Sequence, residues 1–68
     1  MTRKELNQIL PHGAIKIIAE QAGVHYATVS RFLKDDNMKN VKVEIAVLEY
    51  VLKLEKRKSE LYKELQNL

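Results

Sequence analysis

The sequence predicts an all-α fold: a helix-turn-helix domain of three short helices, followed by one long C-terminal helix that forms a dimeric helix pair or coiled coil. Apolar residues recur at helical spacing along the chain. One proline and two glycines are too few for the turns of a β-rich fold. No breaker interrupts residues 41–68. We therefore divide the chain into a helix-turn-helix domain over 1–40 and a dimerisation helix over 41–68.

The first helix is expected to begin after Thr2 and to end before Pro11. Thr2 and Glu5 have the spacing of a capping box, in which each side chain satisfies a backbone N–H of the other. Pro11 ends the helix, because the residue before a proline is disfavoured in the α region. The apolar residues of this helix share one face: Leu6, Ile9 and Leu10.

Two more short helices are expected on either side of a turn at Gly23. The second begins at residue 13 or 14 and ends at 22, and the third covers residues 26–33. Asn40 is a suitable N-cap for the long helix that follows. The inward positions of the two short helices are Ile15, Ile18, Ala19 and Ala22, then Val29, Phe32 and Leu33.

Residues 15–33 jointly satisfy what two helices need in order to cross at about 90–120° through a short turn. Ala19 is small where the second helix passes over the first. Gly23 is free to adopt a positive φ, and Val24 places an apolar side chain after it. Val29 is compact enough to be buried at the crossing. The joint match predicts a helix-turn-helix.

The long helix carries an apolar heptad pattern. Residues 43–54 are apolar on almost every side, so three short helices can cover only part of this surface. Lys58 occupies an a position, which costs stability but favours a low oligomer number and one register. We expect self-association as a homodimer, or a higher oligomer. The alternative is an amphipathic helix that folds back on its own domain. The spacing alternates four and three at Val47, Val51, Leu54, Lys58, Leu61, Leu65 and Leu68.

Length and composition favour a partner chain as the source of extra stability. A domain below roughly 70–80 residues usually needs a disulfide, a metal or oligomerisation. The 68 residues include no cysteine, and the two histidines, His12 and His25, lie in no ligand cluster. We therefore expect no metal and no cofactor. His12 is expected to be only a turn residue.

Charge and hydropathy favour a soluble protein. The net charge of +3 has its excess in residues 1–34, where five basic side chains face two acidic ones. No apolar run approaches the roughly 20 residues needed to span a bilayer, and the N-terminus has no secretory pattern. We expect a cytoplasmic protein with no membrane partner. No carboxylate pair, nucleophile–base pair or glycine-rich phosphate loop is present, so we expect no enzyme.

The segment AEQAGVHYATVSRFL resembles the helix-turn-helix of lac-repressor-type regulators, whose pattern is Ala-x-x-Ala-Gly-Val-Ser-x-x-Thr-Val-Ser-Arg. It is similar, more loosely, to the Cro and repressor domains of temperate phages. The resemblance covers residues 14–34 and includes neither a sugar-binding domain nor the long helix. It implies a small DNA-binding regulator whose third helix lies in the major groove of DNA.

The resemblance also implies which residues of the third helix meet base edges. These are Tyr26 and Ala27 at its start, with Ser30 and Arg31 one turn later. Tyr26 and Arg31 are the best candidates, because Arg can pair bidentately with guanine. Ala27 stands where the lac-type pattern carries a glutamine, so base reading there is weakened. In the alternative interpretation, Tyr26 is simply exposed and Arg31 pairs with a neighbouring carboxylate.

A second group of residues is expected to contact phosphates. Gly13 and Ala14 supply backbone amides at the start of the second helix, where the helix dipole favours an anion. His25 replaces a serine cap, and we expect it to be a poorer cap that instead contacts a phosphate more strongly once protonated. The side chains in this group are Lys16, His25, Thr28 and Lys34, with Arg3 and Lys4 as further candidates.

These observations predict a sequence-specific regulator of transcription that binds double-stranded DNA as a homodimer on a palindromic site. Its two recognition helices are expected about 34 Å apart, one turn of DNA. No small-molecule effector is expected, since there is no ligand domain. The alternative is a protein-interaction module that binds another protein through residues 43–54 and does not bind DNA.

Overall fold

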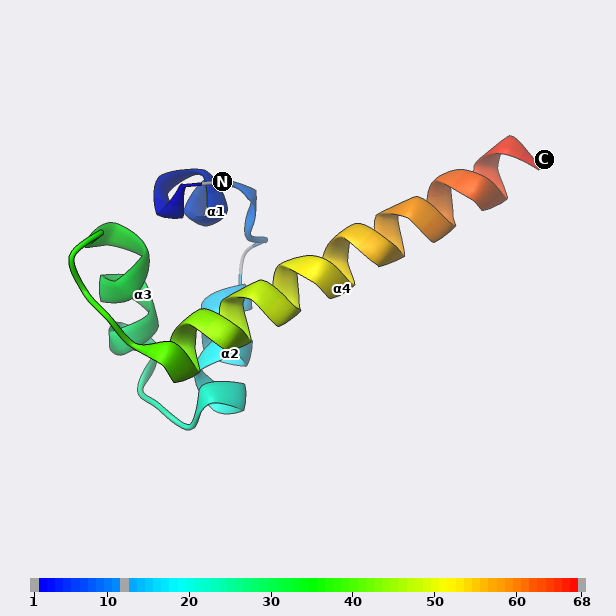
Figure 1. Ribbon diagram of the computed structural model, residues 1–68. Coiled ribbons are helices and arrows are strands. Elements are labelled where there is room, and N and C mark those ends of the chain that lie inside the picture. Colours follow the sequence, from blue (N-terminus) through cyan, green and yellow to red (C-terminus); the bar gives the residue numbers. More distant parts are fainter. Residues whose placement is uncertain (1, 12, 68) are drawn as a thin grey trace.

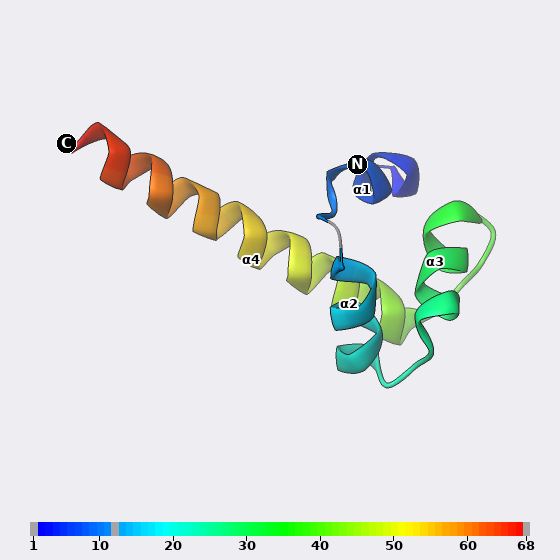
Figure 2. The same ribbon diagram turned by 180° about the vertical axis from the view of Figure 1, so that it is seen from behind.

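The computed structural model describes residues 2–11 and 13–67, which contain four α-helices and no strand. The helices are α1 (Arg3–Ile9), α2 (Ala14–Ala22), α3 (Tyr26–Lys34) and α4 (Val41–Gln66). The three short helices gather at one end of α4, and the C-terminal half of α4 projects away from them (Figures 1 and 2). We call residues 2–51 without His12 the head. The all-α prediction with a long C-terminal helix is confirmed.

Side-chain caps set the starts of α1 and α4 as the sequence predicted. The Thr2 hydroxyl accepts a hydrogen bond from the backbone N–H of Glu5 at 3.1 Å. The Asn40 side-chain oxygen accepts one from the N–H of Val43 at 3.2 Å. Each cap satisfies a donor that has no partner within its helix. The predicted turn residue His12 and the seam residue Leu68 lie outside the described residues.

The turn between α2 and α3 depends on Gly23, which has φ 71° and ψ 33°. The N–H of Val24 donates to the carbonyl of Ala19 at 3.0 Å, and the N–H of Gly23 donates to the carbonyl of Glu20 at 3.3 Å. These two bonds form a Schellman motif, which needs a left-handed residue where a side chain would be strained. The predicted role of Gly23 is confirmed.

The core is shared by all four helices, with α2 at its centre. α2 packs against both α3 and α4, and α1 packs mainly against α3. Because α4 contributes to this core, the packing crosses the boundary we placed between residues 40 and 41. The first part of α4 therefore completes the head. The buried side chains are Leu6, Ala14, Ile18, Ala19, Val29, Phe32, Leu33, Val43, Ala46 and Val47.

The packing of α1 differs from the sequence prediction. Leu6 is buried and Leu10 is half-buried, but Ile9, expected on the inward face, is 37% exposed. Helix α1 packs mainly against α3, and this contact leaves Ile9 uncovered. Ile15 of α2, also expected inward, is half-buried at the edge of the core.

The C-terminal part of α4 leaves the head after Val51, the last residue of the helix that packs against the core. The helix then continues for about 22 Å, which gives the molecule its extents of 45 × 22 × 19 Å. A helix of this length is marginal in water by itself. No helix in the described part of the chain is long and apolar enough to cross a membrane.

Two adjacent isoleucines test this account of the core. Ile18 is fully buried, whereas Ile17 is 45% exposed. We expect Ile18→Ala to lower the free energy of unfolding by about 2–5 kcal/mol, since it leaves a cavity. Ile17→Ala should cost less than about 1 kcal/mol. Urea unfolding at one fixed protein concentration measures both, and equal losses would contradict the assigned orientation of α2.

Candidate nucleic-acid interface

The outward face of α3 carries a polar and basic stripe. The opposite face holds Val29, Phe32 and Leu33, which are buried and fasten the helix to the head. Helix α3 is therefore held by one side and presents the other to solvent. The residues on the presented side have the spacing i, i+3, i+4 and i+7, which places them on one face: Ala27, Ser30, Arg31 and Lys34.

An open groove of about 1050 Å³ lies between this face of α3 and the junction of α1 with α2. The wall opposite α3 is formed by Asn7, Leu10, Pro11, Gly13, Ile15 and Lys16, and Asp35 lies beyond the end of α3. The groove brings together seven of the residues that the sequence predicted to contact DNA. They are Gly13, Lys16, Tyr26, Ala27, Ser30, Arg31 and Lys34.

The groove has a positive charge balance and an apolar wall. Lys16, Arg31 and Lys34 contribute three positive charges against the single negative charge of Asp35, which leaves +2. All four side chains are exposed. Ile15 and Leu10 supply apolar surface across from α3. Such a surface attracts a polyanion while offering apolar contacts beside its charges.

His25 fills the capping role that we expected it to fill poorly. Its Nδ1 accepts a hydrogen bond from the backbone N–H of Ala27 at 3.1 Å. Its ring also lies against the ring of Tyr26, with centroids 4.4 Å apart and planes at 33°. Since Nδ1 accepts this bond, Nε2 is the ring nitrogen left for a phosphate. His25 thus positions both the start of α3 and the Tyr26 ring.

The start of α2 departs from the sequence expectation at Ala14. Its amide donates to the carbonyl of Pro11 at 3.1 Å and its side chain is buried, so it is not free to bind a phosphate. Gly13 precedes the helix with φ 89°, and among the described residues no side chain caps α2. Lys16 lies exposed nearby. Thr28 is half-buried and does not line the groove.

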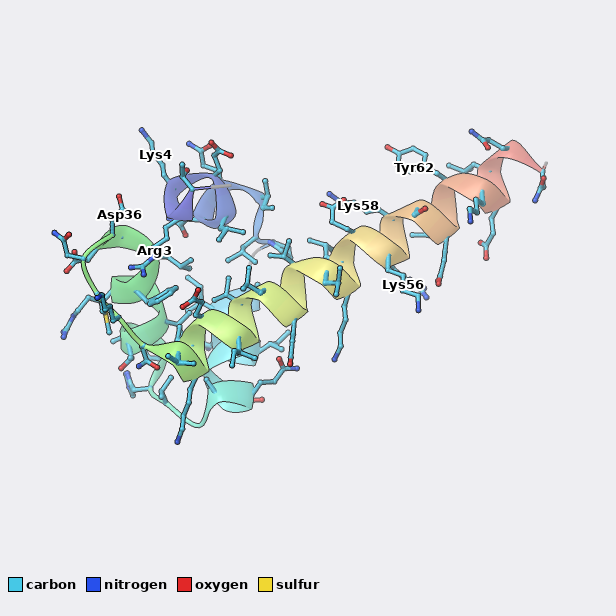
Figure 3. All side chains as sticks on the ribbon, in the orientation of Figure 1. Arg3, Lys4, Asp36, Lys56, Lys58 and Tyr62 are labelled. Carbon is cyan, nitrogen blue, oxygen red and sulfur yellow. The ribbon has the colours of Figure 1, made fainter. Side chains whose placement is uncertain are left out.

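Arg3 has a structural role instead of the phosphate contact that we considered. Its Nη1 donates to the carbonyl of Phe32 at 3.2 Å and to the carbonyl of Asp35. Its guanidinium carbon also lies 3.9 Å from the centroid of the Phe32 ring. A cation is favourable beside the free carbonyls at a helix C-terminus. Arg3 points toward α3, whereas Lys4 points away from the head (Figure 3).

Five residues that line the groove were not among the predicted DNA contacts: Asn7, Leu10, Pro11, Ile15 and Asp35. Asn7 reaches it because α1 packs on α3, a pairing that the apolar pattern of a seven-residue helix does not specify. Asp35 follows α3 directly, where its own backbone N–H bonds to the carbonyl of Arg31 at 2.9 Å. The sequence had offered Asp35 only as a possible surface partner of Arg31, and both residues line the groove.

The predicted dimerisation residues differ in how far they are buried. Val47 is 1% exposed and belongs to the core of the head, so it is not available to a second chain. Val51 and Leu54 are half-buried, and every described residue after them is exposed. We call Leu54, Lys58, Leu61 and Leu65 the open seam. The open seam lies on the part of α4 that the head does not cover.

A second apolar surface lies on the opposite side of α4, next to the head. We call it the back stripe. Its four side chains are spaced four, three and four residues apart, and each is more than half exposed. Part of residues 43–54 was expected to need another cover, and three residues of the back stripe, Ile45, Leu48 and Leu52, belong to that part. The back stripe consists of Val41, Ile45, Leu48 and Leu52.

Comparison of the chain with protein-family models, with curated proteins and with solved structures found no match. Residues 2–11 and 13–67 contain no cluster of three or more acidic or histidine side chains that is arranged to hold a metal ion. The function is therefore inferred from the groove and from the two apolar surfaces of α4.

Substitution of His25 tests the cap. His25→Ala removes the acceptor for the N–H of Ala27 and should lower the free energy of unfolding by about 0.5–2 kcal/mol. His25→Ser restores a capping oxygen and should stay close to the parent protein. Urea unfolding of the three proteins at equal concentration measures the difference. If alanine and serine at this position are equally stable, the imidazole is not a cap.

Proposed function

We propose that this protein is a sequence-specific regulator of transcription that binds double-stranded DNA as a homodimer on a palindromic site. The observation that carries the proposal is the groove, because residues separated along the chain meet there on one basic surface. Its central element is α3, which is fastened by its buried face and presents the other. The helix-turn-helix pattern in residues 15–33 and its resemblance to lac-type regulators support the same function.

In this proposal α3 enters the major groove, which is about 12 Å wide and admits one helix. Arg31 pairs with O6 and N7 of a guanine, the strongest base discrimination available to this face. Tyr26, more than half exposed at the start of α3, supplies a hydroxyl and a ring edge. Ser30 contacts either kind of base, and Ala27 offers only a methyl group. Specificity is therefore carried mainly by Arg31 and Tyr26.

Phosphate contacts then fix the register of the head on the duplex without reading sequence. Lys16 and Lys34 lie on opposite walls of the groove and reach the two sides of a bound strand. The Nε2 of His25 and the amide of Gly13 add hydrogen bonds to phosphates. The hydroxyl of Thr28 adds another from the flank of α3. These interactions set affinity, and they make it strongly dependent on salt.

The homodimer is supported by the exposed end of α4. The open seam lies on a helix that is marginal without a partner, and pairing with a second copy covers its apolar side chains. A partner that binds only the folded state also stabilises the head by mass action. Two heads related by a two-fold axis match a palindromic site.

A specific observation favours a second candidate, a protein-interaction module without DNA binding. The four side chains of the back stripe form an exposed apolar surface beside the head, and such surfaces often mark protein contacts. A salt titration separates the two candidates. DNA binding should weaken with a log–log slope of about −0.9 for each phosphate contacted. An absence of binding to any duplex at low salt would favour the second candidate.

Selection of bound duplexes from random DNA tests the proposal directly. The proposal expects recovery of a palindromic sequence by a protein whose mass in solution is that of a dimer. Failure to enrich any sequence, with the protein folded and at high concentration, would overturn it.

Three single substitutions separate base contacts from phosphate contacts. Arg31→Ala should relax base preference at one position per half-site, with a loss of about 1–3 kcal/mol of discrimination. Lys16→Ala should weaken binding to all sequences alike. It should also reduce the magnitude of the log–log salt slope by about 1, the share of one phosphate contact. Lys56→Ala is the matched control, since Lys56 lies on α4 far from the groove (Figure 3). Quantitative binding to variant duplexes measures each effect, and an unchanged preference in Arg31→Ala would contradict the assigned role.

A further inference from the structure

We propose that a second copy of this chain covers the open seam in the antiparallel direction. In the proposed register, Leu54 of one copy lies opposite Leu65 of the other, and Lys58 lies opposite Leu61. This inference rests on the homodimer of the proposed function and adds its direction and register.

The open seam continues the face by which α4 packs on its own head. Val43 and Val47 are buried there, and Val51 packs against the same core. Leu54 lies three residues after Val51 and Leu61 lies seven residues after Leu54, two spacings that keep both side chains on this face. The head covers the face up to Val51, and no other element of the described chain covers the part beyond it. A partner that covers this face must therefore pack on the residues of α4 that follow Val51.

The proposed register keeps the paired region outside both heads. In the proposed register Gln66, the last residue of α4, lies at the level of Lys53 in the second copy. Residues 53–66 of one copy then lie alongside residues 53–66 of the other, beyond the part of α4 that each head covers. The same face of α4 is then covered first by its own head and next by the end of the second copy.

Lys58 favours this direction over a parallel pair. In a parallel pair in register, the two Lys58 ammonium groups would occupy facing a positions and repel each other. In the antiparallel register each Lys58 lies opposite Leu61, so its methylene chain packs on leucine while its ammonium group reaches solvent. A shallow hollow on the surface of α4 is lined by Lys58, Leu61, Tyr62 and Leu65. Lys58 and Tyr62 are marked in Figure 3.

The charges that flank the open seam are complementary in the same register. In an antiparallel coiled coil, g positions of one helix face g positions of the other, and e positions face e positions. Arg57 and Glu64 are g positions, and Glu55 and Tyr62 are e positions. Arg57 of each copy then lies beside Glu64 of the other, which gives two symmetric ion pairs. Glu55 lies beside Tyr62, whose hydroxyl can donate to the carboxylate. A parallel pair would place Arg57 beside Tyr62 instead and would leave Glu64 without a basic partner.

This arrangement determines how far apart the two heads lie. The register separates the two Val43 residues by about 50 Å along the helix axis, at 1.5 Å per residue. α3 lies at the end of the molecule opposite the C-terminus of α4 (Figures 1 and 2), so the recognition helices stand near the outer ends of the pair. Their half-sites are therefore more than one turn of DNA apart, unlike the spacing of about 34 Å expected from the sequence.

Disulfide trapping tests the register, because the chain has no cysteine of its own. Chains carrying Leu54→Cys and chains carrying Leu65→Cys are mixed in equal amounts and oxidised. The proposal expects the mixed disulfide as the main product and little cross-linking of either variant alone. Identical positions are about 16 Å apart along the axis in this register, beyond the roughly 7 Å between Cα atoms that a disulfide can bridge. Efficient self-linking of each variant would show a parallel pair and overturn the proposal.

Charge reversal provides an independent measurement. Arg57→Glu and Glu64→Arg should each raise the dissociation constant of the dimer by about 2- to 30-fold, as expected for two exposed ion pairs. The double variant exchanges the charges and should return to within about twofold of the parent protein. Sedimentation equilibrium measures the constants, and circular dichroism checks that each variant is folded. A double variant no better than the single ones would contradict the register.

The result is separable from the proposed DNA binding. If the mixed disulfide fails to form while duplex selection recovers a palindrome, the register is wrong and the regulator stands. If the mixed disulfide forms while no duplex is enriched, the register stands and the proposed function fails. A chain that remains monomeric at high concentration overturns the antiparallel pair.

Discussion

The crossing of α2 and α3 is the constraint on which the rest of the structure depends. Ile18 and Val29, both fully buried, belong to the core that fixes the two helices against each other. Gly23 sets the path between them by adopting a conformation that an L-residue reaches only with strain. Because the buried face of α3 is held in this way, Ala27, Arg31 and Lys34 on its other face stay exposed. Arg3 closes the assembly by joining α1 to the carbonyls at the end of α3.

A chain of 68 residues leaves little room for separate structural and functional elements. α4 serves two purposes: its first part completes the core of the head, and its second part carries apolar residues that the head cannot reach. His25 likewise caps α3 and supports the ring of Tyr26. Small domains commonly need an added source of stability. Here self-association through α4 would supply that stability and also join two copies of α3 in one assembly.

The sequence predicted those features that depend on local chemistry. The caps at Thr2 and Asn40 and the left-handed residue Gly23 are determined by neighbouring residues, and all three are confirmed. Features that depend on how helices pack were predicted less well. Ile9 is exposed and Val47 is buried in the head, because periodicity identifies a face of a helix but not what covers it. The same limit applies to the groove: its α3 wall followed from the sequence, whereas Asn7 depended on where α1 packs.

The central claim is that the presented face of α3 is the surface that meets DNA. Amide chemical-shift mapping by NMR, during titration of the labelled protein with a mixed-sequence duplex at low salt, tests this claim most directly. The account predicts the largest shift changes in residues 13–16 and 26–34, with the back stripe nearly unchanged. Changes confined to residues 41–52 of α4, or no changes in α3 at saturating duplex, would contradict it.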